Sequence, residues 1–121
     1  MEKQNIVQEK SFRFALKIVE LYRKLVAERE YVLSKQILRS GTSIGANIEE
    51  ATGAMTRKDF AARITIAYKE SRETVYWLKI LKCSNYVAPE PAETLMNECV
   101  EITKILSKIQ KTLPHSKLKP L

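Results

Sequence analysis

The sequence is poor in the residues that most often carry chemistry. Its 121 residues include one histidine, two cysteines, one tryptophan and three glycines. The single histidine, His115, lies close to the C-terminus, so no histidine cluster is available for a zinc or di-iron site. The cysteines, Cys83 and Cys99, lack the CxxC spacing of a metal or redox motif. Both fall at or near apolar helical positions, and we expect them to be buried and reduced.

Longer features are missing as well. No stretch of about 18 apolar residues could span a bilayer, and Met1 to Lys10 are too polar for the apolar segment of a secretory signal. We therefore expect a soluble, cytoplasmic protein that does not bind a membrane. No segment alternates with the period of a β-strand, and no hairpin dipeptide occurs. All three glycines lie between residues 41 and 53, so no glycine-rich phosphate loop is present.

What the sequence has is helical periodicity. Apolar residues recur at steps of three and four along most of the chain, which is the spacing of helices with one buried face. The pattern predicts four helices, the first from about Asn5 to about Ala27. The predicted buried stripes are Val7, Ser11, Phe14, Ile18, Leu21 and Leu25; Ile37, Gly41, Ile44, Ile48 and Ala51; Phe60, Ile64, Ala67, Ser71, Thr74, Leu78 and Leu81; and Leu95, Cys99, Ile102, Leu106, Ile109 and Leu113.

Capping residues indicate where the second and third helices begin. Ser34 can cap the second helix, although Tyr31 is an equally plausible start. Gly53 suits the left-handed residue that ends this helix. Thr56, with an acidic residue three positions later, predicts a capping box at the start of the third helix. Met55 is placed to form a hydrophobic staple with Phe60 across this start.

The remaining boundaries depend on asparagine and proline. Asn85 can close the third helix just after Cys83, and Pro89 and Pro91 are tolerable only outside the fourth helix or within its first turn. Pro114 should stop the fourth helix. Short connections make neighbouring helices antiparallel, so we predict an all-α, antiparallel up-down-up-down four-helix bundle over residues 1–113. Residues 114–121 form a basic C-terminal tail that we expect to be flexible.

A second, polar stripe runs beside the apolar one on the second helix, and a matching set lies on the third. Gly41 and Gly45 each cost a helix about 1 kcal/mol against alanine, so we expect them to permit close approach of a neighbouring helix. Small polar residues beside glycines indicate a covered face. The face is either an intrachain network that fixes helix register or a subunit interface, which we favour as a working hypothesis. Its residues are Gln36, Ser40, Gly41, Ser43, Gly45, Asn47, Glu50, Glu70, Glu73 and Trp77.

Two segments carry a family resemblance. They read QILRSGTSIGANIEEA (36–51) and DFAARITIAYKESRETVYWLKIL (59–81). Together with KSFRFALKIVELYRKL (10–25), they resemble the four-helix-bundle protein family encoded by intervening sequences in bacterial large-subunit rRNA genes. The resemblance implies an up-down bundle that assembles into a pentameric ring or barrel, with a largely unassigned function. A distant relative, the accessory variability protein of diversity-generating retroelements, forms a basic five-fold barrel that engages a reverse transcriptase and RNA.

Carboxylates on the second and third helices raise the question of catalysis. Glu49 and Glu50 could face Glu70 and Glu73, as in helical magnesium-dependent nucleotide pyrophosphohydrolases. No further acidic residue follows Glu73 by three or four positions, so the set lacks a second pair. Without a core histidine, no serine, cysteine or lysine has a neighbouring base. We therefore expect no catalysis, metal, cofactor or small-molecule substrate, with the pyrophosphohydrolase as the alternative.

The net charge of +7 favours polyanions. Arg57 and Lys58 stand in the first turn of the third helix, where the helix dipole disfavours positive charge. Repeated around a ring, the cations would form a surface that holds RNA phosphates. The chain is therefore predicted to be a non-catalytic homo-oligomeric scaffold or binding protein whose partner is RNA or an RNA-processing protein. The candidate nucleic-acid-binding residues are Lys10, Arg13, Lys17, Lys24, Arg57, Lys58, Lys117 and Lys119.

Overall fold

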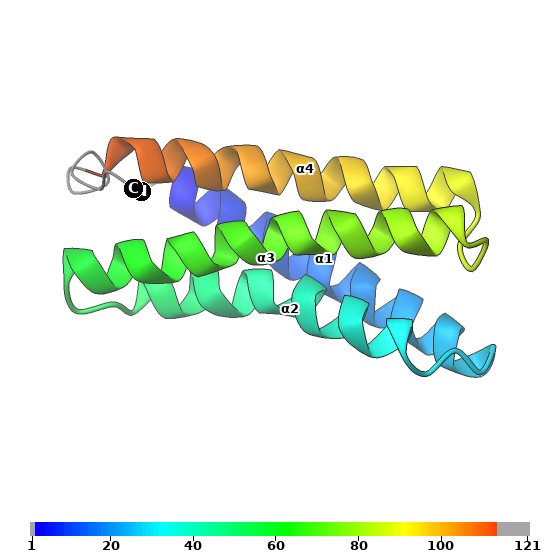
Figure 1. The fold of residues 1–121 in the computed structure, drawn as a ribbon. Coiled ribbons are helices and arrows are strands. Elements are labelled where there is room, and N and C mark those ends of the chain that lie inside the picture. Colours follow the sequence, from blue (N-terminus) through cyan, green and yellow to red (C-terminus); the bar gives the residue numbers. More distant parts are fainter. Residues whose placement is uncertain (1, 114–121) are drawn as a thin grey trace.

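The chain folds into four α-helices joined by short turns (Figure 1). The computed structural model describes the backbone of residues 2–113 and the side chains of residues 5–113. The predicted tail, with the predicted helix stop at Pro114, lies outside the described residues. The helices are α1 (Glu2–Ala27), α2 (Leu33–Thr52), α3 (Arg57–Cys83) and α4 (Pro89–Thr112). The predicted fold class is confirmed.

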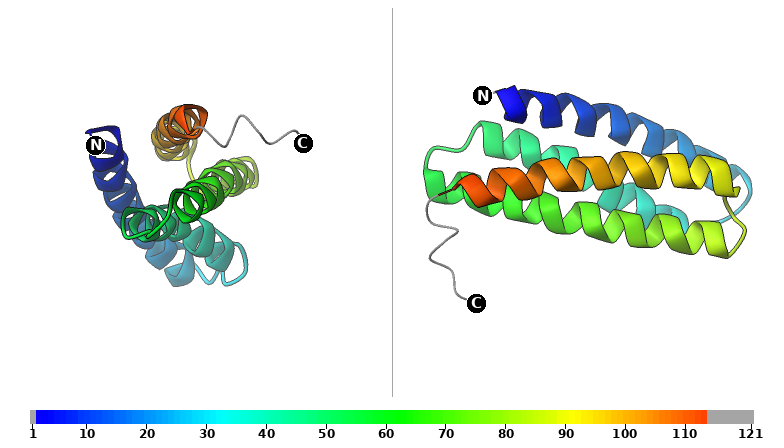
Figure 2. Two further views of the ribbon diagram at one scale, coloured as in Figure 1. Left: turned by 90° about the vertical axis from the view of Figure 1, so that its left-hand side faces the viewer. Right: turned by 90° about the horizontal axis from the view of Figure 1, so that it is seen from above.

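Helices that follow one another in sequence pack side by side in an up-down-up-down arrangement. The contact between α1 and α4, which would close the bundle, is less extensive than each contact between helices that follow one another in sequence. Figure 2 shows the reason, because the N-terminal end of α1 lies apart from α4 in both views. The bundle is therefore close-packed from α1 through α2 and α3 to α4, and more open between its first and last helices.

The predicted stripes form the core. Those of α1 and α2 are buried throughout, and those of α3 and α4 are buried except for half-buried residues at their ends. The 3.6-residue period brings one face of each helix to the bundle axis, which explains why spacing alone located the core. Within residues 2–113, no helix has both the length and the apolar composition needed to cross a bilayer. The half-buried stripe residues are Phe60, Leu95 and Leu113.

The start of α2 differs from the prediction. The helix begins at Leu33, and Ser34 does not cap it. Instead, the carboxylate of Glu30 accepts hydrogen bonds from the backbone N–H groups of Val32 (3.2 Å), Leu33 (2.9 Å) and Ser34 (2.6 Å). Desolvation acts to raise the pKa of Glu30, but these donors outweigh it and hold the pKa below its ordinary value. An acidic residue before the helix therefore does the capping that was assigned to a serine.

The helix ends correct the prediction for Gly53 and agree with those for Asn85 and the two prolines. Gly53 has a φ of −94°, so it is not the left-handed residue that was predicted. Its N–H instead closes a tight turn on the carbonyl of Glu50 at 3.2 Å. Asn85 does adopt a left-handed conformation, with φ of 68°, just past the end of α3. Pro89 and Pro91 lie in the first turn of α4 as predicted.

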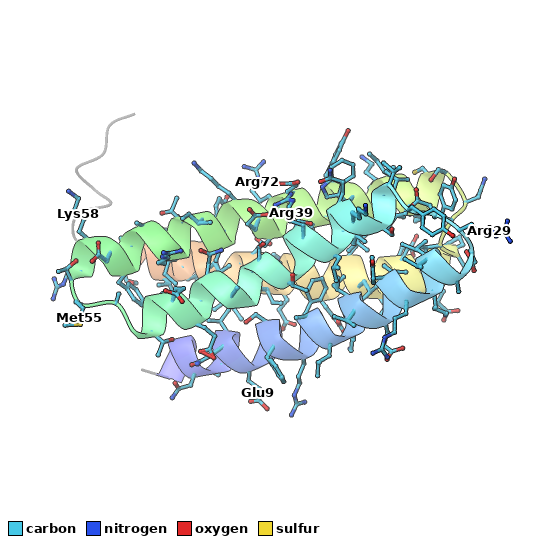
Figure 3. The ribbon with its side chains drawn as sticks, turned by 90° about the horizontal axis from the view of Figure 1, so that it is seen from below. Glu9, Arg29, Arg39, Met55, Lys58 and Arg72 are labelled. Atoms are coloured by element: carbon cyan, nitrogen blue, oxygen red, sulfur yellow. The ribbon has the colours of Figure 1, made fainter. Side chains whose placement is uncertain are left out.

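Thr56 caps α3 as predicted, because its hydroxyl accepts a hydrogen bond from the N–H of Asp59 at 3.0 Å. The prediction of a hydrophobic staple is wrong. Met55 is 92% exposed and projects away from the bundle (Figure 3), so it does not cover Phe60. The short α2–α3 turn places the side chain outside the core, whereas Phe60 packs against the core by itself.

Candidate functional site

An arginine joins α2 to α3 at the predicted polar stripe. Arg39 forms ion pairs with Glu70, at 3.2 Å, and with Glu73. The indole N–H of Trp77 donates to the same Glu73 carboxylate at 2.8 Å. The structure thus brings Glu70, Glu73 and Trp77 of the predicted set together around Arg39, which was not in that set. The sequence did contain a signal for Arg39, because this cation stands next to the polar stripe of the second helix.

Hydroxyl groups continue this network into the core. The Thr74 hydroxyl lies 3.0 Å from the hydroxyl of Ser40. Nearer α4, the Thr103 hydroxyl lies 2.7 Å from that of Ser71. Ser40, Ser71 and Thr74 are fully buried, so these pairings satisfy polar atoms that would otherwise be stranded in an apolar core. The network therefore fixes the register of α2 on α3 and of α3 on α4.

The other predicted polar residues of α2 lie nearer the surface. Asn47 accepts a hydrogen bond from Arg63 of α3 at 3.1 Å and donates to the carbonyl of Ser43 at 2.9 Å. Gln36 is half-buried, and Glu50 is exposed. The structure thus joins part of the stripe to α3 and leaves its outer edge accessible.

Of the two interior glycines, only Gly41 lies at a contact too close for a Cβ atom, as predicted for both, and the neighbouring helix is α1 of the same chain. A Cβ atom added at Gly41 would lie 2.8 Å from Cγ1 of Ile18, which is an impossible contact without a shift. One added at Gly45 would lie 3.4 Å from the backbone oxygen of Ser11, an ordinary contact. Gly41 is therefore the position at which α1 and α2 are pressed together.

The carboxylates of α2 and α3 do not converge. Glu49 lies on the α1 side of α2, where its carboxylate accepts a hydrogen bond from Gln8 at 2.7 Å. Glu70 and Glu73 lie on the other side and hold Arg39. Over the residues that the structure describes, no group of three or more histidine, cysteine, aspartate or glutamate side chains could hold a metal ion. The facing carboxylates that the pyrophosphohydrolase alternative needs are not assembled.

The predicted cations of α1 are mostly neutralised. Lys17 binds Glu98 of α4 at 2.5 Å, and Lys10 binds Glu101 of α4 at 3.4 Å. Arg13 binds Glu9, one turn away on α1, at 2.7 Å. Lys24, Arg57 and Lys58 are exposed, and Lys117 and Lys119 lie outside the described residues.

The ion pairs between α1 and α4 border an open groove of about 360 Å³. Ile6, Phe14 and Ile102 contribute apolar surface, and side chains of both charges contribute the rest. Because cations and carboxylates alternate along this groove, it has no excess charge of one sign. Its charged lining residues are Glu9, Lys10, Arg13, Lys17, Glu98 and Glu101.

An apolar pair remains uncovered on α1. Phe12 is 63% exposed and Leu16, one turn later, is 53% exposed. The chain by itself does not bury either side chain. Phe12 follows by one turn Gln8, which contacts Glu49 of α2, so the pair lies on the outer side of α1 toward α2.

The two cysteines differ. Cys99 is fully buried, as predicted, and burial raises the pKa of its thiol to about 12. Cys83 is exposed, which corrects the prediction for that residue. It occupies the last turn of α3, where the face that points into the bundle has already ended at Leu81.

The family model described as 23S rRNA-intervening sequence protein matches residues 3–108. A crystal structure of a protein of unknown function from the S23 ribosomal protein family of Bacteroides thetaiotaomicron is similar, with 51% sequence identity and a TM-score of 0.89. The match covers 91% of this chain and 99% of that one. No curated protein matches. Since the model covers nearly the whole bundle and the crystal structure shares its fold, the chain belongs to the 23S rRNA-intervening sequence protein family.

Proposed function

We propose that this protein is a non-catalytic, homo-oligomeric scaffold that binds RNA or an RNA-processing protein through a basic surface. The observation that carries the proposal is the apolar pair Phe12 and Leu16, exposed in the middle of a helix whose other face is fully buried. Large apolar side chains next to one another on a surface mark sites of protein association. A second copy of the chain is the occupant that this proposal assigns.

The polar network supports a scaffold rather than an enzyme. Its carboxylates, Glu70 and Glu73, are held in place by Arg39 and Trp77. Such a network sets the positions of helices, which is the requirement of an assembly with a defined shape. The excess of cations gives that assembly a positive field that grows with each added subunit.

The assembly is tested by the solution mass of the purified chain, measured by multi-angle light scattering. The wild type should have a multiple of the chain mass of 13.9 kDa. The double substitution Phe12→Glu and Leu16→Glu should reduce the mass to that of one chain while the helical circular dichroism remains. Met55→Glu is the control, because Met55 is exposed at a loop rather than beside another apolar side chain. A wild type that is monomeric would contradict the proposal.

Binding to RNA is tested separately, by filter binding of a structured RNA at about 50 mM salt and again at raised salt. Binding that weakens as salt increases is expected for contacts to phosphates. The absence of binding at the lower salt would remove RNA as the partner and leave an RNA-processing protein.

A further inference from the structure

The outer face of α3 is a stripe of cations without an acidic residue. Positions 58, 62, 65, 69, 72, 76 and 79 follow helical steps, and all are exposed except half-buried Thr65. Four of them are Lys58, Lys69, Arg72 and Lys79. At 1.5 Å per residue, the stripe from the first to the last of these extends over about 32 Å. Lys58 and Arg72 project outward from α3 (Figure 3).

These cations differ from Lys10, Arg13 and Lys17 of α1, each of which has a carboxylate partner. Among residues 5–113, none of the four takes part in an ion pair. The two glutamates of α3, Glu70 and Glu73, are on its α2 side, where they bind Arg39. The positive charge of the stripe is therefore available to a partner from solution.

The C-terminal half of α4 extends the same positive surface. The contacts of Thr103 with Ser71 (2.7 Å) and of Gln110 with Thr65 (3.1 Å) place this half of α4 beside the N-terminal half of α3. Three exposed lysines of α4 lie in this region, also without ion pairs in the part of the chain that the structure describes. The α3–α4 basic face comprises Lys58, Lys69, Arg72, Lys79, Lys104, Lys108 and Lys111.

An aromatic side chain lies within the stripe. Tyr76 is 56% exposed and falls one turn after Arg72 and one turn before Lys79. Its ring packs edge-on against Trp77, with ring centroids 5.3 Å apart, and that contact restrains its orientation. The guanidinium of Arg72 is held in turn 5.9 Å above the ring of Tyr68. Cations beside an exposed, oriented aromatic ring are the elements that bind single-stranded nucleic acids without sequence preference.

We propose that the α3–α4 basic face binds the phosphate backbone of single-stranded RNA and that Tyr76 stacks on one of its bases. This inference rests on the proposed function and names the surface that performs it. It moves the contact away from Lys10, Arg13 and Lys17 of α1, which form ion pairs with carboxylates of the same chain. A duplex would offer the phosphates but not the base, so single strands are the ligand that uses both features.

The experiment compares two triple variants that each remove three positive charges. The first carries Lys69→Gln, Arg72→Gln and Lys79→Gln on the face. The second, the control, carries Arg13→Gln, Lys17→Gln and Lys24→Gln on α1. Binding is measured by fluorescence anisotropy with a labelled single-stranded RNA of about 20 nucleotides, after light scattering and circular dichroism show that both variants keep the wild-type mass and helicity.

The face variant should bind at least tenfold more weakly, and the control should stay within about threefold of the wild type. The slope of log affinity against log salt should fall in magnitude by about 2, since each phosphate contact contributes about 0.7 for single strands. An equal loss in both variants, or a larger loss in the control, would overturn the assignment to the α3–α4 basic face. A wild type that binds no RNA would instead defeat the proposed RNA function itself.

The stacking contact has its own test. Tyr76→Ala should lower affinity for the single strand by about tenfold, whereas Tyr76→Phe, which retains the ring, should not. Neither substitution should change binding to a duplex of the same sequence. Unchanged affinity of Tyr76→Ala for the single strand would show that the face holds phosphates only and would remove the preference for single strands.

Discussion

Helix α1 contacts the bundle on two sides in opposite ways. Toward α2 it comes so close that Gly41 leaves no room for a Cβ atom beside Ile18. Toward α4 it borders an open groove and is joined by two solvent-exposed ion pairs, Lys10 with Glu101 and Lys17 with Glu98. Exposed ion pairs contribute about 0–1 kcal/mol. The comparison indicates that α1 packs more closely against α2 than against α4.

The largest expected effect is at the close contact. Gly41→Ala adds a Cβ atom 2.8 Å from Ile18, which is fully buried and too stiff at its branched Cβ to turn away. Overpacking of this kind costs about 1–3 kcal/mol and should exceed the gain in helix propensity. Urea denaturation at a fixed protein concentration should show a lower midpoint. A midpoint equal to or above that of the wild type would contradict the close contact.

The next effect concerns the turn that connects α1 with α2. Glu30→Ala removes the acceptor for three backbone N–H groups and should lower the free energy of unfolding by about 1–2 kcal/mol at neutral pH. Because the folded-state pKa of Glu30 lies below its ordinary value, its contribution is present above the unfolded-state pKa and is lost as the pH falls through the folded-state pKa. The stabilities of wild type and variant should therefore converge below about pH 4. A difference that stays constant into acid would contradict capping by the ionised carboxylate.

A smaller effect of opposite sign is expected four residues along α2. Gly45→Ala places a Cβ atom at 3.4 Å from Ser11, which is an ordinary van der Waals contact between α2 and α1. Alanine then gains about 0.5–1 kcal/mol of helix propensity over glycine. Thermal unfolding should occur at a higher temperature than in the wild type. Destabilisation by this substitution would mean that the close approach of α1 extends beyond Gly41.

The smallest effect on stability is expected at the contact between α1 and α4. Glu98→Gln breaks the ion pair with Lys17, whose two side chains are partly in water, and should change the free energy of unfolding by less than about 0.5 kcal/mol. Hydrogen exchange provides the measurement that matters here, because local separation of α1 from α4 should be detected before global unfolding. A loss of stability as large as that of Gly41→Ala would show that the contact of α1 with α4 is as sensitive to substitution as its contact with α2.

The sequence predicted those features that depend on neighbours within a helix. The apolar spacing located the buried faces of all four helices, since residues three and four apart share a face. Asn85 and Thr56 were predicted correctly because their short polar side chains act on the adjacent backbone. Gly53 and Met55 were not, because the geometry of the α2–α3 turn depends on how two helices pack rather than on the turn residues alone.

The candidate site was predicted less completely because its contacts are distant in sequence. Lys17 and Glu98 are 81 residues apart, so the neutralisation of α1 was not visible from the spacing of its cations. Arg39 reaches 34 residues along the chain to Glu73, and a long charged side chain on a polar stripe is usually solvated. Gly41 was identified as a close contact, but local periodicity does not say which helix lies opposite.

Because one thiol is buried and the other is exposed, their reactivities can be used to measure how often the core of the protein opens. With a pKa of about 12, the sulfur of Cys99 contains almost no thiolate at neutral pH, and it is shielded from reagents as well. Cys83 at the end of α3 is accessible at once. A brief pulse of an alkylating reagent should therefore add one adduct to a folded chain and two to a chain that has opened enough to expose Cys99. Mass spectrometry then measures the fraction of chains that have opened, and a fluorophore on Cys83 labels the end of α3.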